Sequence, residues 1–183
     1  MSEDDNDYVL RCIRGDREAF GTLVDRYQRP VFNAVLRMVR SNEDASDVTQ
    51  QIFLKAYTNL NRFDTKRKFF SWLYRLAMNE TINFLRSRRE HEELSESLQA
   101  PDRSAEERLE ADETAAIVRQ EVGNLNVDHR AVIVLRHFLQ LSYHEAAEVL
   151  DVPEKTVKSR LFSARETLRG SLLARGVGRG MNR

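Results

Sequence analysis

The sequence predicts an all-α protein of two small helical domains joined by a flexible acidic linker, the second domain containing a helix-turn-helix. The 183 residues include only seven glycines and three prolines, which leaves little material for turns. Apolar residues recur mainly at helical spacing. Charge is also segregated, although the net charge is zero. Residues 62–89 and residues 154–183 each carry eight basic and two acidic side chains, whereas residues 91–112 carry eight acidic and two basic ones.

These blocks set the expected domain boundaries. Residues 7–90 form the first domain, residues 91–112 the linker, residues 113–174 the second domain and residues 175–183 a loose basic tail. Two basic modules with an acidic tether are typical of a chain that contacts nucleic acid through both modules. The alternative for the linker is a solvated spacer with no further role.

In the first domain we expect helices over residues 7–14 and 17–27, broken at Gly15, and another helix that starts at Pro30. Cap-type residues at 41–44 precede a helix that continues to about Leu60. One side of that helix is apolar, with Ile52 and Phe53. The outer side holds Asp47, Gln51, Leu54 and Lys55. An exposed leucine usually has no function, but a leucine between polar groups is also typical of a docking surface.

The helix expected over residues 69–89 has an unusual outer side. At 100° per residue, its inner side is apolar, and the outer side holds Trp72, Arg75, Asn79, Asn83 and Arg86. Guanidinium groups bind phosphates, Asn hydrogen-bonds base edges, and an exposed aromatic ring stacks on an unpaired base. The alternative is that Trp72 covers a neighbouring helix and that the polar groups are solvated.

The second domain ends in two helices separated by a tight turn. Apolar stripes predict one helix around residues 116–122 and another from Ala131 to Phe138. Ser142 and Glu145 then form a capping box that starts a short helix, and Pro153 ends it and starts the next. The last helix is basic on its outer side, as in a helix-turn-helix that reads DNA. Its expected DNA contacts are Lys155, Lys158, Ser159, Phe162, Ser163 and Arg165.

Several classes of protein and site are not indicated. The sequence holds no glycine-rich phosphate loop or nucleophile elbow, and its four histidines lack the spacing of a metal site, so we expect no enzyme, no cofactor and no metal. The single cysteine, Cys12, excludes an internal disulfide. We see no signal peptide and no apolar stretch of roughly 20 residues. A cytoplasmic protein without membrane insertion is expected.

Four segments resemble the extracytoplasmic-function (ECF) sigma factors, the smallest promoter-specificity subunits of bacterial RNA polymerase. They are GDREAFGTLVDRYQRPVFNAVLRMV, DVTQQIFLKAYTNLNRF, FFSWLYRLAMNETINFLR and LSYHEAAEVLDVPEKTVKSRLFSARETL. The resemblance implies two helical domains on a flexible linker. It also implies core RNA polymerase and promoter DNA as partners, and control by a separate anti-sigma factor.

The resemblance also implies roles for the outer residues. Those at 47–55 would dock on the polymerase, those at 72–86 would open the −10 element and hold a flipped base near Asn79, and those of the last helix would enter the major groove at −35. Two departures bear on these roles. Gln51 stands where the family often has glutamate, and Ser163 stands where arginine is common.

The main alternative is a stand-alone helix-turn-helix regulator whose first domain senses a ligand or dimerises. It leaves the outer side at Trp72 and Asn79 unexplained. A nuclease is a more distant alternative, because the chain has no carboxylate or histidine cluster.

Overall fold

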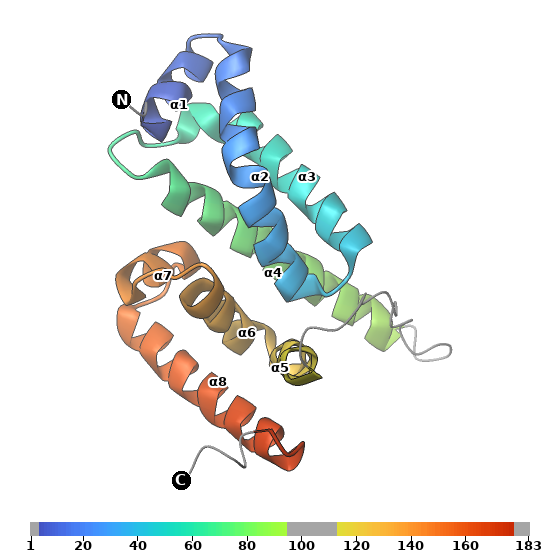
Figure 1. The fold of residues 1–183 in the computed structure, drawn as a ribbon. Coiled ribbons are helices and arrows are strands. Elements are labelled where there is room, and N and C mark those ends of the chain that lie inside the picture. The colour runs from blue at the N-terminus through green and yellow to red at the C-terminus, as the bar shows by residue number, and fades with distance from the viewer. Residues whose placement is uncertain (1–3, 95–112, 178–183) are drawn as a thin grey trace.

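The computed structural model describes residues 4–94 and 113–177, and every regular element in those ranges is helical (Figure 1). This confirms the predicted all-α fold of two helical domains. The predicted linker lies mostly outside the described residues, as does the tail beyond residue 177. The first domain contains α1 (Asp5–Ile13), α2 (Arg17–Val39), α3 (Asn42–Asn59), the 3-10 turn η1 (Leu60–Arg62) and α4 (Phe69–Leu94).

Over the described residues 113–177, the second domain contains five helical elements. They are α5 (Glu113–Asn124), α6 (Val127–Ile133), the π-helical turn η2 (Val134–Phe138), α7 (Tyr143–Leu150) and α8 (Glu154–Ala174).

The first domain is a bundle in which α2 packs against α1, α3 and α4. Local signals begin two of its helices: Asp16 caps α2 by accepting hydrogen bonds from two backbone amides, and Ser41 caps α3 by accepting one from Asp44. Each helix then buries one apolar stripe. The fully buried side chains at the centre include Leu23, Met38, Ile52, Leu73 and Met78.

The predicted helix start at Pro30 is wrong, because α2 continues without a break from Arg17 to Val39. A proline inside a helix lacks one backbone donor and costs about 3 kcal/mol. The same face of α2 buries Leu23 before Pro30 and Val31 and Val35 after it. Burial of each of these side chains stabilises the folded state by about 1.5–3 kcal/mol. A continuous buried face therefore outweighs the local effect of the proline.

The second domain contains the predicted helix-turn-helix. The capping box at the start of α7 is present: Glu145 N donates to Ser142 Oγ at 3.1 Å, and Ser142 N donates to Glu145 Oε2 at 2.9 Å. Asp151 ends α7 in the left-handed conformation, with φ 54°, and Pro153 precedes α8. Val157 and Leu161 of α8 are buried.

One member of the predicted apolar stripe, Phe138, is not buried. Its side chain is 42% exposed. The backbone is π-helical from Val134 to Phe138, and a wider turn shifts the direction of the side chains that follow it. Phe138 leaves the core stripe for this reason and meets Arg37 of the first domain, whose guanidinium carbon lies 4.4 Å from the ring centroid.

The two domains are in contact in this structure. α7 packs along α4, and η2, α5 and α6 approach α2 (Figure 1). The helix that carries the first group of predicted DNA contacts therefore lies beside the helix-turn-helix.

Candidate nucleic-acid interface

The α4 face consists of Trp72, Arg75, Asn79, Asn83 and Arg86, all on one helix as predicted. Asn79, Asn83 and Arg86 are exposed. The opposite side of α4 is anchored in the core by fully buried residues, among them Leu73, Tyr74 and Thr81. Thr81 Oγ1 donates to the Ala77 carbonyl at 2.7 Å, so its hydroxyl is satisfied inside the helix. Burial raises the pKa of Tyr74 to about 12.

Trp72 is half-buried. Its ring centroid lies 5.4 Å from that of Phe63 and 5.7 Å from that of Phe69. Phe63 is itself buried directly after η1. The alternative interpretation had Trp72 cover a neighbouring helix; the ring packs instead on Phe69 of its own helix and on Phe63 of the preceding segment, at the edge of the α4 face.

The segment from 61 to 68 brings a basic group beside this face. Arg62, Lys66, Arg67 and Lys68 are exposed. The segment is held by α1, because the Asn6 side-chain amide donates to the Thr65 carbonyl at 2.9 Å and to the Arg67 carbonyl at 3.3 Å. This role of Asn6 was not predicted. A contact between residues this far apart in the chain leaves no periodic pattern.

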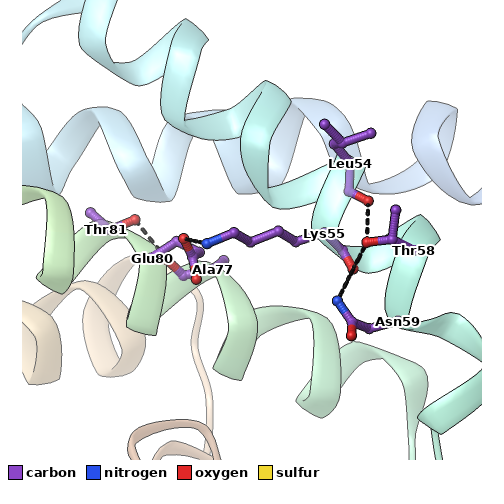
Figure 2. Close-up of polar contacts among 7 residues, drawn as sticks. All are labelled: Leu54, Lys55, Thr58, Asn59, Ala77, Glu80 and Thr81. Atoms are coloured by element: carbon purple, nitrogen blue, oxygen red, sulfur yellow. Dashed lines mark hydrogen bonds and ion pairs between the residues drawn. The ribbon is translucent and has the colours of Figure 1, made fainter.

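The α3 face consists of Asp47, Gln51, Leu54 and Lys55, and all four side chains are exposed. Leu54 is 64% exposed. Lys55 forms an ion pair with Glu80 of α4, which ties the two helices together (Figure 2). On the same helix Thr58 Oγ1 donates to the Leu54 carbonyl at 3.0 Å (Figure 2).

Tyr57 lies beside this face but was not among its predicted residues. Its side chain is 41% exposed, and its ring lies edge-on to Phe20 with centroids 5.0 Å apart. Because Tyr57 is three residues after Leu54, the two side chains share one side of α3. Helical spacing from Leu54 was the signal that could have identified it.

The α8 face consists of Lys155, Lys158, Ser159, Phe162, Ser163 and Arg165. Five of them are exposed and Ser163 is partly exposed. Phe162 is 68% exposed, which makes it the most exposed of the large apolar side chains within the described residues. Lys158 Nζ lies 2.6 Å from Glu154 Oε1 on the same helix.

Arg165 has a partner outside α8, because its Nη2 lies 3.3 Å from His137 Nε2. Burial, together with Arg165 and Arg136, lowers the pKa of His137. The imidazole is therefore neutral at physiological pH and able to accept a hydrogen bond from Arg165.

Within the part of the chain that the structure describes, Arg75 is the one member of the α4 face with an ion-pair partner in the second domain. Its Nη2 lies 2.5 Å from Asp151 Oδ2, in the turn of the helix-turn-helix. Asp151 was not among the predicted site residues.

Over residues 4–94 and 113–177, no group of three or more His, Cys, Asp or Glu side chains is placed to hold a metal ion. Over the same ranges, no helix combines the length and the hydropathy needed to cross a bilayer.

Comparison with known proteins gives two family matches. The sigma-70 region 2 model matches residues 23–91, which include the α3 and α4 faces, and the sigma-70 region 4 model matches residues 115–168, which include the α8 face. Together the two models cover more than half of the chain.

Individual proteins are similar over nearly the full length. The RNA polymerase sigma-H factor of Pseudomonas aeruginosa is 36% identical over 182 residues, spanning 91% of this chain and 92% of that protein. The ECF RNA polymerase sigma-E factor of Escherichia coli K12 is 37% identical over 182 residues, spanning 92% and 95%. Among solved structures, CnrH in complex with the cytosolic domain of CnrY has a TM-score of 0.71 and 29% identity, over 94% of this chain and 99% of that one.

Proposed function

Because this chain belongs to the extracytoplasmic-function group of the sigma-70 family, we propose that its three outer faces divide the work of promoter recognition. The chain is a sigma factor, a specificity factor for transcription initiation. The α3 face docks on core RNA polymerase, the α4 face opens the −10 element, and the α8 face reads the −35 element. The polymerase supplies the catalysis, and the complex acts in the cytoplasm.

The observation that carries the proposal is that one chain holds both sigma-70 regions in order, each with an exposed polar and basic face. A stand-alone helix-turn-helix regulator has no use for region 2. The comparisons therefore favour the sigma factor over that alternative.

Docking through the α3 face is supported by its chemistry. Leu54 is exposed between polar groups, with Tyr57 one turn away. An apolar anchor inside a polar rim is the usual anatomy of a protein–protein interface. Lys55 is held in place by Glu80 of α4, so docking at α3 and promoter contact at α4 share a rigid support.

Base selection at −10 is supported by the arrangement of α4. Asn79 and Asn83 are exposed one turn apart, and an amide offers a donor and an acceptor to the edge of an unstacked base. Flipping a base out of the duplex costs a few kcal/mol, and stacking on an aromatic side chain returns about 1–3 kcal/mol. Asn79 selects the base after strand opening, and Asn83 and Trp72 support it.

Recognition at −35 uses the exposed side of α8. Lys158 and Arg165 supply phosphate contacts, whereas Ser159, Phe162 and Ser163 lie closer to base edges. Phe162 is exposed enough to contact a thymine methyl group. The serine at 163 makes the −35 preference differ from that of relatives with arginine there.

A separate anti-sigma protein is the proposed regulator. The solved neighbour CnrH was determined in complex with the cytosolic domain of another protein, CnrY, and it shares 29% identity with this chain over nearly its whole length. The exposed apolar and basic faces described above are the surfaces that such a partner would cover.

The test is reconstitution with purified core RNA polymerase and a promoter library. We expect specific transcription that depends on this chain, and co-purification with the polymerase. The double variant Gln51→Arg with Leu54→Arg should lose co-purification while it keeps the helical circular-dichroism signal. Gln28→Arg, at an exposed position on α2, is the control that should leave binding unchanged. Unaltered co-purification of the double variant would place the docking surface elsewhere.

A further inference from the structure

A histidine of η2 lies against the α8 face. Arg165 Nη2 approaches His137 Nε2 at 3.3 Å, and both side chains are exposed. A guanidinium has only donors, so Nε2 must be the acceptor and the ring proton must lie on Nδ1. In the free protein the imidazole is therefore neutral, and its acceptor nitrogen is occupied by Arg165.

The same side of α8 meets a second cation of η2. Lys158 and Arg165 are seven residues apart, about two helical turns, so they lie on one side of the helix. Lys158 Nζ lies 5.3 Å from the centroid of the Tyr143 ring, and the guanidinium carbon of Arg136 lies 4.3 Å from the same centroid. Arg136 and His137 are consecutive residues. A basic edge of four side chains therefore extends the α8 face onto η2.

The surroundings of the imidazole disfavour its protonation in the free protein. Partial burial, Arg165 and Arg136 lower the pKa of His137. Arg37 of α2 lies over the ring of the next residue, Phe138. Other charged groups on the elements around η2 have partners of their own: Asp128 of α6 pairs with Arg160, Arg130 of α6 donates to backbone carbonyls, and Glu145 and Glu148 of α7 contact Ser142 and His144. Within the described residues, the charges that act on His137 are cations.

A phosphate bound at this place reverses the balance. Two nitrogens 3.3 Å apart are close enough to donate to one phosphate group, whose oxygens are anionic acceptors. A nearby negative charge favours the charged form of histidine. Arg165 Nη2 then turns from the imidazole to the phosphate. Nε2 takes a proton from solvent and donates a hydrogen bond to the same phosphate.

We propose that His137 and Arg165 form a phosphate clamp at the edge of the α8 face, and that His137 takes up one proton from solvent when a backbone phosphate of the DNA binds there. This inference rests on the proposed function of the α8 face and adds a contact from outside α8. His137 is neutral in the free chain and becomes a second cationic donor beside Arg165 on DNA. Because a phosphate contact carries no sequence information, the clamp contributes affinity and leaves base preference unchanged.

The clamp determines the sign of a pH effect. Since the phosphate raises the pKa of His137, DNA binding takes up a proton, and affinity should rise as the pH falls through the ordinary histidine value of about 6.5. An increase of one pKa unit on binding corresponds to at most about a tenfold gain in affinity. We therefore expect binding about threefold to tenfold tighter at about pH 5.5 than at about pH 7.5.

The first test is fluorescence anisotropy of the full chain with a fluorescein-labelled DNA duplex of mixed sequence. His137→Gln keeps an acceptor for Arg165 but cannot be protonated, so it should match the parent at the higher pH and lose the gain at the lower one. His137→Lys is charged at both values and should bind tightly at both. A purely structural role of His137 would weaken binding in both variants at both pH values.

The matched control is His144→Gln. His144 is an exposed histidine of α7 whose Nε2 lies 3.7 Å from Glu148 Oε1, away from the cations of the basic edge. This variant should keep the pH dependence of the parent, and circular dichroism verifies that every variant is folded. The same pH dependence in His137→Gln as in the parent would overturn the proposal.

Nuclear magnetic resonance follows the proton in the parent protein itself. In a chain labelled with ¹⁵N-histidine, the ring nitrogen shifts report the tautomer and the pKa of each imidazole. We expect the Nδ1–H tautomer for His137 in the free protein, and a pKa higher by about one unit with saturating duplex. His144 should change little. An unaltered pKa of His137 on DNA would contradict the clamp even if the variants failed to fold.

Two further variants separate the clamp from the wider assignment of the α8 face. Lys158→Ala and Arg165→Gln should each weaken duplex binding, and Lys158→Ala should keep the gain at low pH. If neither variant changes affinity, the α8 face does not bind DNA, and its proposed function fails together with the clamp. If both weaken binding while His137→Gln titrates like the parent, the clamp alone is refuted.

Discussion

The α4 face and the α8 face contain similar side chains in different surroundings. Each combines basic groups, small polar groups and one aromatic ring. On α4 the ring of Trp72 packs on Phe63 and Phe69, and Arg75 is paired with the other domain. On α8 the ring of Phe162 is 68% exposed, and Lys158 is paired within its own helix.

This difference shows that composition alone does not determine how a binding face behaves. The α8 face is complete within one small domain and depends little on what surrounds it. The α4 face is supported by α1, α3 and the segment 61–68, and it is opposed by α7. Changes at α4 should therefore affect stability and domain arrangement together with DNA binding, whereas changes at α8 should affect DNA binding alone.

The largest contrast is expected when each face loses its aromatic ring. Trp72→Ala removes contacts with Phe63 and Phe69 and should lower the free energy of unfolding by about 2–3 kcal/mol, less than for a fully buried ring. Phe162→Ala removes an exposed ring and should change it by less than about 0.5 kcal/mol. Urea denaturation followed by circular dichroism measures both. Equal losses in the two variants would remove the distinction between the faces.

Asn79→Ala tests the same contrast in promoter opening. Loss of hydrogen bonds to one base should reduce open-complex formation about tenfold and relax the base preference at a single −10 position. The reason is that hydrogen bonds to a base edge favour the correct base over a wrong one by about 1–3 kcal/mol. The −35 preference should stay the same, since we propose that the α8 face reads the −35 element. Permanganate footprinting and a promoter library provide the measurements. A premelted bubble should restore much of the lost initiation.

If Asn79→Ala leaves every −10 preference intact in a protein that still binds polymerase, base selection lies in another part of the first domain. The segment 61–68, held by Asn6, is then the next region to test.

Lys158→Ala should have a smaller and more uniform effect. A phosphate contact carries no sequence information, so binding to all −35 variants should weaken alike, and the slope of log affinity against log salt should fall by about one unit. Titrations at several salt concentrations give this slope. A change of base preference at constant slope would mean that Lys158 reads a base.

The smallest effect concerns pH. The pKa of His137 is lowered in the folded protein by burial and by Arg165 and Arg136. The unfolded chain therefore binds a proton more readily below its ordinary pKa of about 6.5, so stability should fall slightly as the pH decreases through that value. Above it both states are neutral and the effect is absent. His137→Gln should remove this part of the pH dependence in thermal denaturation measured between pH 7.5 and about pH 5.5.

Much of the local structure could be predicted from the sequence, since the signals involved are local. The capping box at Ser142 and the cap at Ser41 begin helices where expected, and helical spacing separates Ile52 and Phe53 inside from Leu54 outside. The error at Pro30 has the opposite origin: a local signal for a break was overridden by burial along the whole of α2.

What could not be predicted depends on contacts between distant parts of the chain. Nothing in the spacing of Arg75 and Asp151 indicates that they meet, because surface charges leave no periodic pattern. Phe138 was expected inside since the π-helical turn before it has no sequence signature. The residue-level roles proposed for the three faces remain predictions for the experiments above.

Trp72 is the only tryptophan of the chain, and it lies at the edge of the α4 face, which we propose contacts the −10 element. Indole emission responds to local polarity and is quenched by a stacked base, so this side chain is an intrinsic optical probe of the site. Selective excitation of tryptophan would report on one position in an unlabelled protein. Stopped-flow fluorescence of the isolated chain with single-stranded DNA would then follow strand capture in real time, without dyes and without altering a residue of the surface under study.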